Sequence, residues 1–229
     1  MGKADRPKRR LLNAAPRMLR GRHVFASLKN IVYTEAVATF DPDTTGVLFI
    51  GHNKITIRRL ELGDAQALGE FFEGISASSR RRYNPHPLTK SEAVKICGEL
   101  PDQRYVRIVA VDSSGRIVGY VVTELFFPED ELTRYRKYGL DLSEDLDCRI
   151  APVVADRLQK RGIGTELMRY GIDLLWAMGR RRIVLFGGTQ ATNAMAKRMY
   201  EKLGFQYAGA FEHKGIDNYD MYVERSPDA

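Results

Sequence analysis

Short runs of apolar and β-branched residues, bounded by turn residues, recur in the first 125 residues and are typical of strands. In residues 55–60 apolar and polar positions alternate, and this run follows the apolar run 46–50 after a turn at His52-Asn53, so the two runs predict a hairpin. Residues 104–112 and 116–125 flank a Ser-Ser-Gly turn and predict a second hairpin. Two antiparallel strand pairs are therefore expected in this part of the chain.

Helical spacing of apolar residues appears between these hairpins and again in the second half of the chain. Asp64 precedes Leu68 and Phe71 and predicts the cap of a first helix, and Ser91 opens a second helix toward Leu100. The second half predicts a strand at 148–154, a helix at 162–178, a strand at 182–186, a helix at 193–203 ended by Gly204, and strands at 205–211 and 219–223. This order predicts an α/β sandwich with a mixed sheet.

Length and charge suggest one domain with an extension. The 229 residues, 44% of them hydrophobic, suffice for a sizeable core. The net charge of +7 comes from residues 1–23, which hold eight Lys or Arg against Asp5, while the remainder balances to zero. We expect a basic N-terminal arm and extension at 1–45, with a strand-like run at 30–40, and a single domain at 46–229. The arm predicts a mobile or loosely docked segment, with nucleic-acid binding, membrane-surface binding or targeting as alternatives; the neutral body predicts no nucleic-acid partner.

Cysteine count and hydropathy narrow the class of protein. Cys97 and Cys148 are the only cysteines, so neither a disulfide framework nor a metal site is expected. No run approaches the roughly 20 apolar residues of a membrane span, and the N-terminus lacks the apolar region of a secretory signal. We expect a cytoplasmic protein without a membrane partner.

A glycine-containing loop, Gln159-Lys160-Arg161-Gly162-Ile163-Gly164-Thr165, joins the strand at 148–154 to the next helix. Such a loop directs consecutive backbone N–H groups at one point, and the helix N-terminus adds about half a positive charge, so a pyrophosphate can bind there. Gly162 and Gly164 would let phosphates approach the backbone. A third glycine at dinucleotide spacing and a Gly-Lys-Ser/Thr ending are both missing, so Rossmann and P-loop sites are not expected; a plain strand-to-helix turn is the alternative.

A second pattern follows the strand at 182–186, where Asn193, Ala196, Tyr200 and Phe205 stand in the order Asn-x-x-Ala-x-x-x-Tyr-x-x-x-Gly-Phe. Together with the loop, which has the form Q/R-x-x-G-x-G/A, this pattern makes the chain resemble the GNAT N-acyltransferase superfamily. The resemblance covers roughly residues 54–223 and is strongest over 147–207.

This resemblance implies a fold and a co-substrate. The implied fold is a mixed, mostly antiparallel central sheet, splayed between two strands and flanked by helices in a three-layer α/β/α sandwich. Acetyl-CoA is the implied co-substrate, with its pantetheine chain in the gap between strands 148–154 and 182–186. The residues implied to bind it are Val153, Val154, Gln159, Lys160, Arg161, Gly162, Ile163, Gly164, Thr165, Asn193, Ala196 and Tyr200.

The resemblance also implies roles for single side chains. Asn193 would contact the pantetheine arm, cap the following helix, or do both. Tyr200 would be the general acid that protonates the departing CoA thiolate, because a phenol with a pKa near 10 is protonated at neutral pH. A buried core aromatic is the alternative for Tyr200, and Phe205 is expected in the core.

The general base is where the chain departs from the family pattern. Many members carry a Glu eleven residues before the loop's first polar residue, and Cys148 stands at that position here. Asp147, one residue away, is the first candidate base, although in a regular strand it points to the opposite face and would need a bulge or a bridging water. Glu124 and Asp145 are the next candidates.

The implied reaction is transfer of the acetyl group of acetyl-CoA to a primary amine by direct attack in a ternary complex. The expected acceptor is a small molecule such as an amino sugar, an amino acid or a polyamine. Protein lysine or N-terminal acetylation, or a non-catalytic acyl-CoA-binding module, are alternatives, and a homodimer is left open. Residues 124–147 carry eight acidic residues against three basic ones, a net −5, and would face a cationic amine or form a solvated loop.

Overall fold

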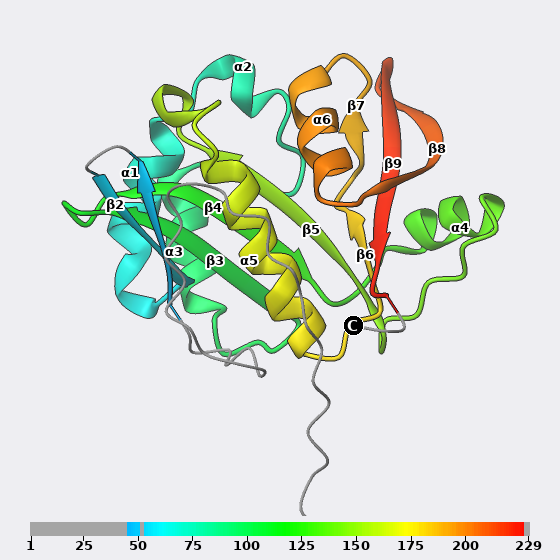
Figure 1. Ribbon diagram of the computed structural model, residues 1–229, viewed down its shortest axis with the longest axis horizontal. Coiled ribbons are helices and arrows are strands. Elements are labelled where there is room, and N and C mark those ends of the chain that lie inside the picture. Colours follow the sequence, from blue (N-terminus) through cyan, green and yellow to red (C-terminus); the bar gives the residue numbers. More distant parts are fainter. Residues whose placement is uncertain (1–44, 51–52, 227–229) are drawn as a thin grey trace, which may run out of the picture.

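The computed structural model describes residues 45–50 and 53–226 (Figure 1). The basic arm, the run at 30–40 and His52 lie outside the described residues. The strands are β1 (Gly46–Ile50), β2 (Asn53–Arg59), β3 (Tyr105–Asp112), β4 (Ile117–Glu124), β5 (Asp147–Val154), β6 (Arg182–Leu185), β7 (Thr189–Gln190), β8 (Gln206–His213) and β9 (Ile216–Glu224). The helices are α1 (Ala65–Glu73), α2 (Ala77–Arg80), α3 (Lys90–Gly98), α4 (Glu129–Lys137), α5 (Ile163–Ala177) and α6 (Ala194–Lys202), with 3₁₀ turns at Leu62–Asp64 and Asp156–Leu158.

One sheet runs through the molecule in the order β1-β2-β3-β4-β5-β6-β9-β7, with β8 paired to β9. Among the described strands, only β5 and β6 pair in parallel, from Asp147 opposite Arg182 to Ile150 opposite Leu185. All other pairs are antiparallel. The predicted mixed, mostly antiparallel sheet is therefore confirmed, and its one parallel pair lies at the centre.

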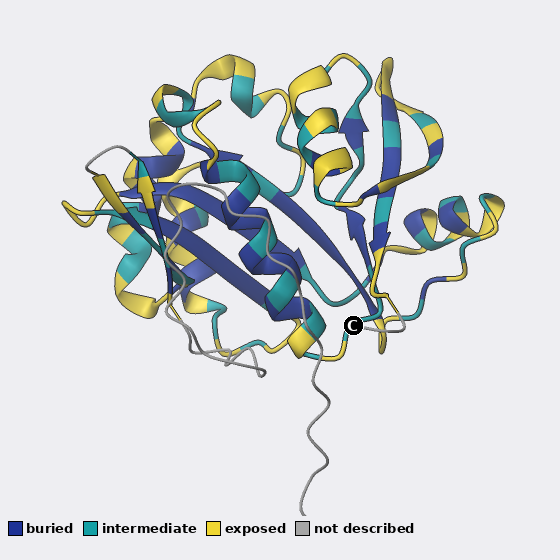
Figure 2. Cartoon of the chain, viewed as in Figure 1, coloured by how far each residue is buried: buried dark blue, intermediate teal, exposed yellow. Residues whose placement is uncertain are grey.

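Two layers of helices cover the sheet, because alternate side chains of each strand point to opposite faces. On β4, Val121 packs toward α5, whereas its neighbours Tyr120 and Val122 pack toward α1 and α3. Figure 1 shows α5 crossing one face with α1 and α3 behind the sheet, and Figure 2 shows the continuous buried stripe along β3, β4, β5 and the inner side of α5. The buried face of α5 follows the apolar periodicity of its sequence.

The acidic segment between β4 and β5 folds back against β6, β8 and β9 and carries α4 (Figure 1). Its charges are largely paired: Arg149 of β5 binds Glu131 at 2.7 Å and also binds Glu124. Arg134 binds the buried Asp220 of β9 at 2.6 Å. This segment is therefore an ion-paired layer over the β6–β9 end of the sheet.

Three local details differ from the expected elements. The C-terminal strands are longer than expected and meet in a tight turn, because Lys214 and Gly215 both adopt positive φ, as a two-residue hairpin turn requires. The side chain of Asp64 does not cap α1; its carboxylate binds Arg58 at 2.7 Å and the backbone N–H of Glu61 at 2.9 Å. The short elements α2 and β7 were not expected.

Both cysteines are free and buried. No helix in the described ranges has the length and apolar character that crossing a bilayer requires. Within the same residues, no group of three or more His, Cys, Asp or Glu side chains is arranged to hold a metal ion.

Candidate active site

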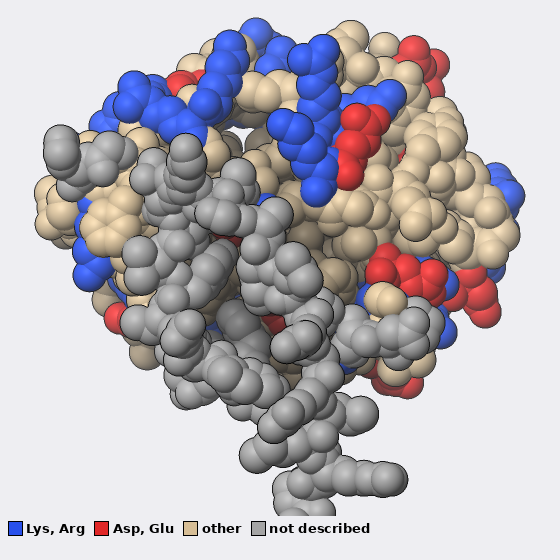
Figure 3. Space-filling view, in the orientation of Figure 1, with Lys and Arg blue, Asp and Glu red and all other residues tan. Residues whose placement is uncertain are grey.

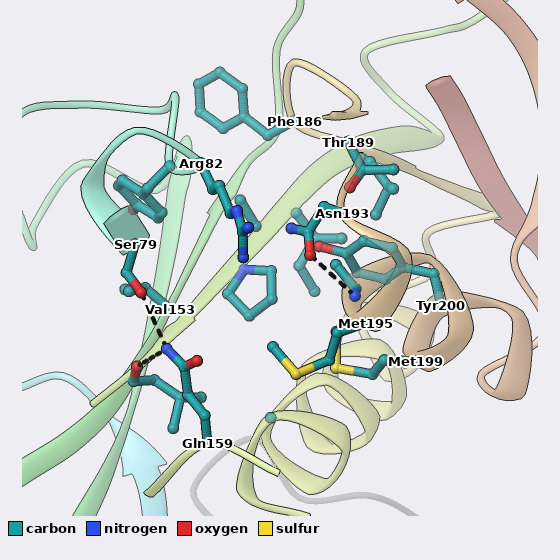
Figure 4. A pocket seen from close by; sticks show the side chains of 18 of the residues that line it. Ser79, Arg82, Val153, Gln159, Phe186, Thr189, Asn193, Met195, Met199 and Tyr200 are labelled. Carbon is teal, nitrogen blue, oxygen red and sulfur yellow. Dashed lines mark hydrogen bonds between the residues drawn. The ribbon is translucent and has the colours of Figure 1, made fainter. Parts of the chain in front are cut away.

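A cavity opens where β5 and β6 separate. The last contact between the two strands is the backbone N–H of Phe186, which donates to the carbonyl of Ile150 at 3.0 Å. Beyond this point residues 151–154 pair only with β4, and the cavity fills the gap between them and the segment that follows β6. Its walls come from α2, β5, the β5–α5 loop, β7 and α6 (Figure 4).

The loop at one end of the cavity presents unpaired backbone donors. Lys160 (φ 60°) and Gly162 (φ 89°) adopt left-handed conformations, and Gly162 is the N-cap of α5. The backbone N–H groups of residues 160–165 form no hydrogen bond with any described residue, and the first paired one belongs to Glu166. Alternating right- and left-handed residues make such N–H groups converge into an anion-binding nest, and the helix dipole adds to it.

Gln159 ties this loop to its surroundings. Its side-chain amide donates to the carbonyl of Val154 at 3.1 Å and to the hydroxyl of Ser79 in α2 at 3.2 Å. Asp156 binds the hydroxyls of Ser76 and Ser79 at 2.7 and 2.6 Å. These hydrogen bonds hold α2 against the β5–α5 loop, so α2 forms one wall of the cavity.

The alternation of β5 decides which backbone groups face the cavity. The carbonyl of Ile150 points toward β6, so Pro152 and Val154 present their backbone to the same side, whereas that of Val153 faces β4. The N–H of Val154 has no partner among the described residues, and Pro152 lacks an N–H where no strand could have accepted one. Val154 thus offers a donor to the cavity, and Val153 offers only its side chain.

Asn193 and Tyr200 line the opposite wall. The Asn193 side chain caps α6 by accepting from the N–H of Ala196 at 3.3 Å, and it also borders the cavity (Figure 4). The hydroxyl of Tyr200 points into the same space and forms no hydrogen bond with any described residue, while its ring packs 5.5 Å from that of Phe205. Burial raises the pKa of Tyr200 above its ordinary value, so the phenol stays protonated across the neutral range.

Most of the residues predicted to bind the cofactor come together here. The ones that line the cavity are Val153, Val154, Gln159, Lys160, Gly162, Gly164, Thr165, Asn193, Ala196 and Tyr200. The side chain of Ile163 packs fully buried in the core, and that of Arg161 is exposed outside the cavity wall. Both residues contribute only their backbone N–H groups to the loop.

None of the three candidate carboxylate bases lines the cavity. Asp147 is fully buried at the far end of β5, where it binds Arg181 at 2.9 Å and the N–H of Ser143 at 2.9 Å. Glu124 is bound by Arg149, and Asp145 is exposed. Cys148 is buried in the core, and burial raises its thiol pKa. The placement of Asp147 argues against the predicted role, because a bulge that would turn its side chain inward is missing from β5.

The wall contributed by α2 and the loop after it was missed by the sequence patterns. Ser79, Arg82, Tyr83, Asn84 and Pro85 line the cavity, yet the sequence marks this region only by its prolines and a run of arginines. The lining residues include two cations, Arg82 and Lys160, and no Asp or Glu. The acidic segment 124–147 contributes no residue to this wall, and its contact with the acceptor stays a prediction.

The charge near the cavity is accordingly positive. In Figure 3, Lys and Arg side chains flank a hollow on the upper edge of the molecule, the edge at which α5 begins. In Figure 4 the guanidinium of Arg82 points into the cavity, and it has neither a hydrogen bond nor an ion pair with the residues described. A free guanidinium and a nest of N–H groups both favour an anionic ligand.

Comparison with known proteins agrees with this geometry. The model of the Acetyltransferase (GNAT) family matches residues 71–205. The GNAT domain of S. lividans PAT superposes with a TM-score of 0.63 at 17% identity, covering 79% of this chain and 97% of that one. Ribosomal-protein-S5-alanine acetyltransferase from Vibrio fischeri gives a TM-score of 0.63 at 13% identity, covering 82% and 100%. The structure of yncA from Salmonella typhimurium with its cofactor acetyl-CoA superposes with a TM-score of 0.57 at 19% identity, covering 76% of this chain and 98% of that one. No curated protein matches the sequence.

Proposed function

The chain belongs to the GNAT acetyltransferase family, and from that premise we propose that it transfers the acetyl group of acetyl-CoA to a primary amine. The observation that carries the proposal is the cavity between the separated ends of β5 and β6. It has an anion-binding loop at one end and a protonated, unpartnered phenol on its wall. The family match supports the transferase class, and the cavity supports the ligand.

The residues of the cavity fit acetyl-CoA. The free N–H groups of residues 160–165 would hold the pyrophosphate, with Lys160 adding charge at the rim. The backbone carbonyl of Pro152, which faces the gap, would accept a hydrogen bond from the pantetheine arm as a neighbouring strand would, and Asn193 offers its amide nitrogen, since its oxygen caps α6. When bound, acetyl-CoA supplies an activated thioester carbonyl.

The chemistry assigned to this chain has two parts. The free N–H of Val154 would donate to the carbonyl oxygen as negative charge develops there. Tyr200 would donate its proton to the sulfur as the carbon–sulfur bond breaks, and would recover a proton from solvent afterwards. The amine attacks the carbonyl directly, so that no covalent enzyme intermediate forms.

The acceptor that the cavity favours is a small primary amine that also carries an anionic group, such as the carboxylate of an amino acid. Arg82 provides an unpaired cation inside the cavity, and no lining carboxylate is available to attract a polyamine. The missing carboxylate is also what favours the second candidate, an acyl-CoA-binding module without catalysis.

One assay separates these candidates. The full-length protein is incubated with acetyl-CoA and one amine at a time, drawn from amino acids, amino sugars, polyamines, and peptides with a free N-terminus or lysine. Release of CoA thiol is followed, and the product is identified by mass. Turnover with an amine establishes the enzyme and its acceptor class. Binding of acetyl-CoA with no acceleration over the blank for any amine would overturn the catalytic proposal and leave the binding module.

A further inference from the structure

The loop between α2 and α3 places a tyrosine and a histidine in contact beside the cavity. Tyr83 lines the cavity, and its hydroxyl lies 2.9 Å from Nε2 of His86. The other ring nitrogen, Nδ1, lies 2.9 Å from the carbonyl oxygen of Pro87. Three groups are therefore connected in one line that begins at the cavity wall.

The direction of these hydrogen bonds follows from their partners. A carbonyl oxygen can only accept, so Nδ1 of His86 carries the hydrogen and Nε2 of the neutral ring is left as an acceptor. The Tyr83 hydroxyl consequently donates to Nε2, and the lone pairs of its oxygen remain available. Burial lowers the pKa of His86 to about 4, which keeps the ring neutral at ordinary pH.

Packing holds the pair in place. The His86 ring lies 5.5 Å from the ring of Phe72 in α1 and 5.7 Å from that of Tyr120 in β4. The Tyr120 hydroxyl is held by Arg107 at 2.7 Å. Because Tyr120 lies opposite Val153 in the sheet, the pair sits over β4 on the α1 and α3 face, beside the strand that borders the cavity.

On the proposed acetyl transfer, we propose that Tyr83 is the proton acceptor for the attacking amine and that His86 relays the proton. As the amine nitrogen bonds to the carbonyl carbon and the carbon–sulfur bond breaks, one N–H proton moves to the Tyr83 oxygen. The hydroxyl proton of Tyr83 moves at the same time to Nε2 of His86. The imidazolium returns the proton to solvent after release, and the sulfur takes its proton from Tyr200, so the step balances.

A weak base suffices for this role. A nitrogen that is forming a bond to a carbonyl carbon becomes a strong acid, so the acceptor needs correct placement more than a high pKa. The relay does not deprotonate a resting ammonium ion, so the amine reacts from its neutral form. A buried neutral imidazole stays ready to accept a proton. No carboxylate lines the cavity, and apart from the cations Arg82 and Lys160 its ionisable lining residues are Tyr83 and Tyr200. Tyr200 is assigned to the sulfur, which leaves Tyr83 for the amine.

Several charged groups surround the pair and affect its protonation. Arg107 of β3 and Lys95 of α3 disfavour a charged imidazole, whereas Glu99 after α3 favours it. Burial raises the pKa of Tyr83, and Tyr120, Glu124 of β4 and Glu92 of α3 raise it further, whereas Arg107 lowers it. These groups lie on the strands and helices packed against the loop, and none replaces His86 as the direct partner of the Tyr83 hydroxyl.

The test uses the full chain with the acceptor found by the amine screen. Tyr83→Phe and His86→Gln are each expected to lower kcat by about 100-fold, with the Kd of acetyl-CoA unchanged. The double variant should be no slower than the slower single one, because both changes interrupt one relay. His213→Gln, an exposed histidine on β8, serves as the matched control and should keep the wild-type rate.

A pH profile distinguishes a proton-relay role of His86 from a structural role. The ratio of wild-type to His86→Gln kcat/KM should be constant from about pH 7 to 9 and should fall as the pH approaches the pKa of His86, because a protonated imidazole cannot accept. Retention of kcat within twofold in both single variants would overturn the relay, as would multiplicative losses in the double variant together with a ratio independent of pH. If wild-type protein transfers no acetyl group, the proposed function fails first, and these variants are not needed to show it.

Discussion

Replacing Tyr200 by Phe removes one hydroxyl from the cavity wall and leaves the packing of the ring intact. The hydroxyl has no hydrogen-bond partner within the described residues, so the variant loses no interaction of the free protein and leaves no buried group unsatisfied. The ring keeps its contact with Phe205, whose centroid lies 5.5 Å away. We therefore expect the unfolding free energy to change by less than about 0.5 kcal/mol.

The loss is confined to the transition state. A hydrogen bond to a developing charge contributes about 1.5–3 kcal/mol, which corresponds to a fall in kcat of about 10- to 150-fold. Because burial raises the pKa of Tyr200, its proton transfer to sulfur is not strongly driven, which places the expected value within this range rather than above it. The KM and Kd for acetyl-CoA should be unchanged.

The assay is steady-state turnover with saturating acetyl-CoA, together with denaturant unfolding of both proteins. Tyr207→Phe, on the exposed strand β8, is the matched control and should match wild type in both measurements. A Tyr200→Phe variant that turns over at the wild-type rate would refute the assignment of the general acid. If Tyr200→Phe lost as much unfolding free energy as activation free energy for kcat, the residue would act through packing.

Three further predictions follow from other parts of the structure. A Cβ on Gly209 would lie 2.2 Å from the Tyr138 ring, so Gly209→Ala should lower the unfolding free energy by about 2 kcal/mol. Gly63→Ala is the control, because a Cβ there meets open space, and denaturant unfolding of it should give the wild-type free energy. Arg82→Met should raise the KM of an anionic acceptor and leave the KM of acetyl-CoA unchanged. Equal increases in the two KM values would indicate that Arg82 contacts acetyl-CoA instead of the acceptor. Since folding lowers the pKa of His86 from 6.5 to about 4, its contribution to stability is complete above pH 6.5 and is lost as the pH falls toward 4, by up to about 3 kcal/mol; His86→Gln should remove this part of the pH dependence of unfolding.

The sequence predicts best what neighbouring residues determine together. The periodicity of α5, the glycine at its start and the cap at Asn193 are local, and each appears in the structure close to its expected place. The separation of β5 from β6 follows the family resemblance, and Pro152 is consistent with it because its missing N–H falls on the open side of the strand.

What the sequence leaves unpredicted depends on contacts between distant segments. Ser79 and Gln159 are joined by one hydrogen bond across 80 residues, so nothing near Ser79 marks α2 as part of the cavity wall. Asp147 looked like a base because it lies next to Cys148, but the parallel pairing of β6 brings Arg181 against it and makes it part of a buried ion pair. No local sequence motif marks His86 as the relay partner either, because its role depends on which of its ring nitrogens faces a carbonyl oxygen in the folded chain.

The most direct test of the central claim is the equilibrium binding of acetyl-CoA to three proteins, measured by calorimetry. Gly162 and Gly115 both adopt positive φ, at 89° and 82°, and a Cβ added at either meets nothing within 4 Å, so alanine imposes similar backbone strain at both. Only Gly162 belongs to the loop that would hold the pyrophosphate. We predict that wild type and Gly115→Ala bind acetyl-CoA with the same Kd and that Gly162→Ala binds about tenfold more weakly, or about 1.4 kcal/mol. Failure of the wild-type protein to bind, or an unchanged Kd in Gly162→Ala, would contradict the account.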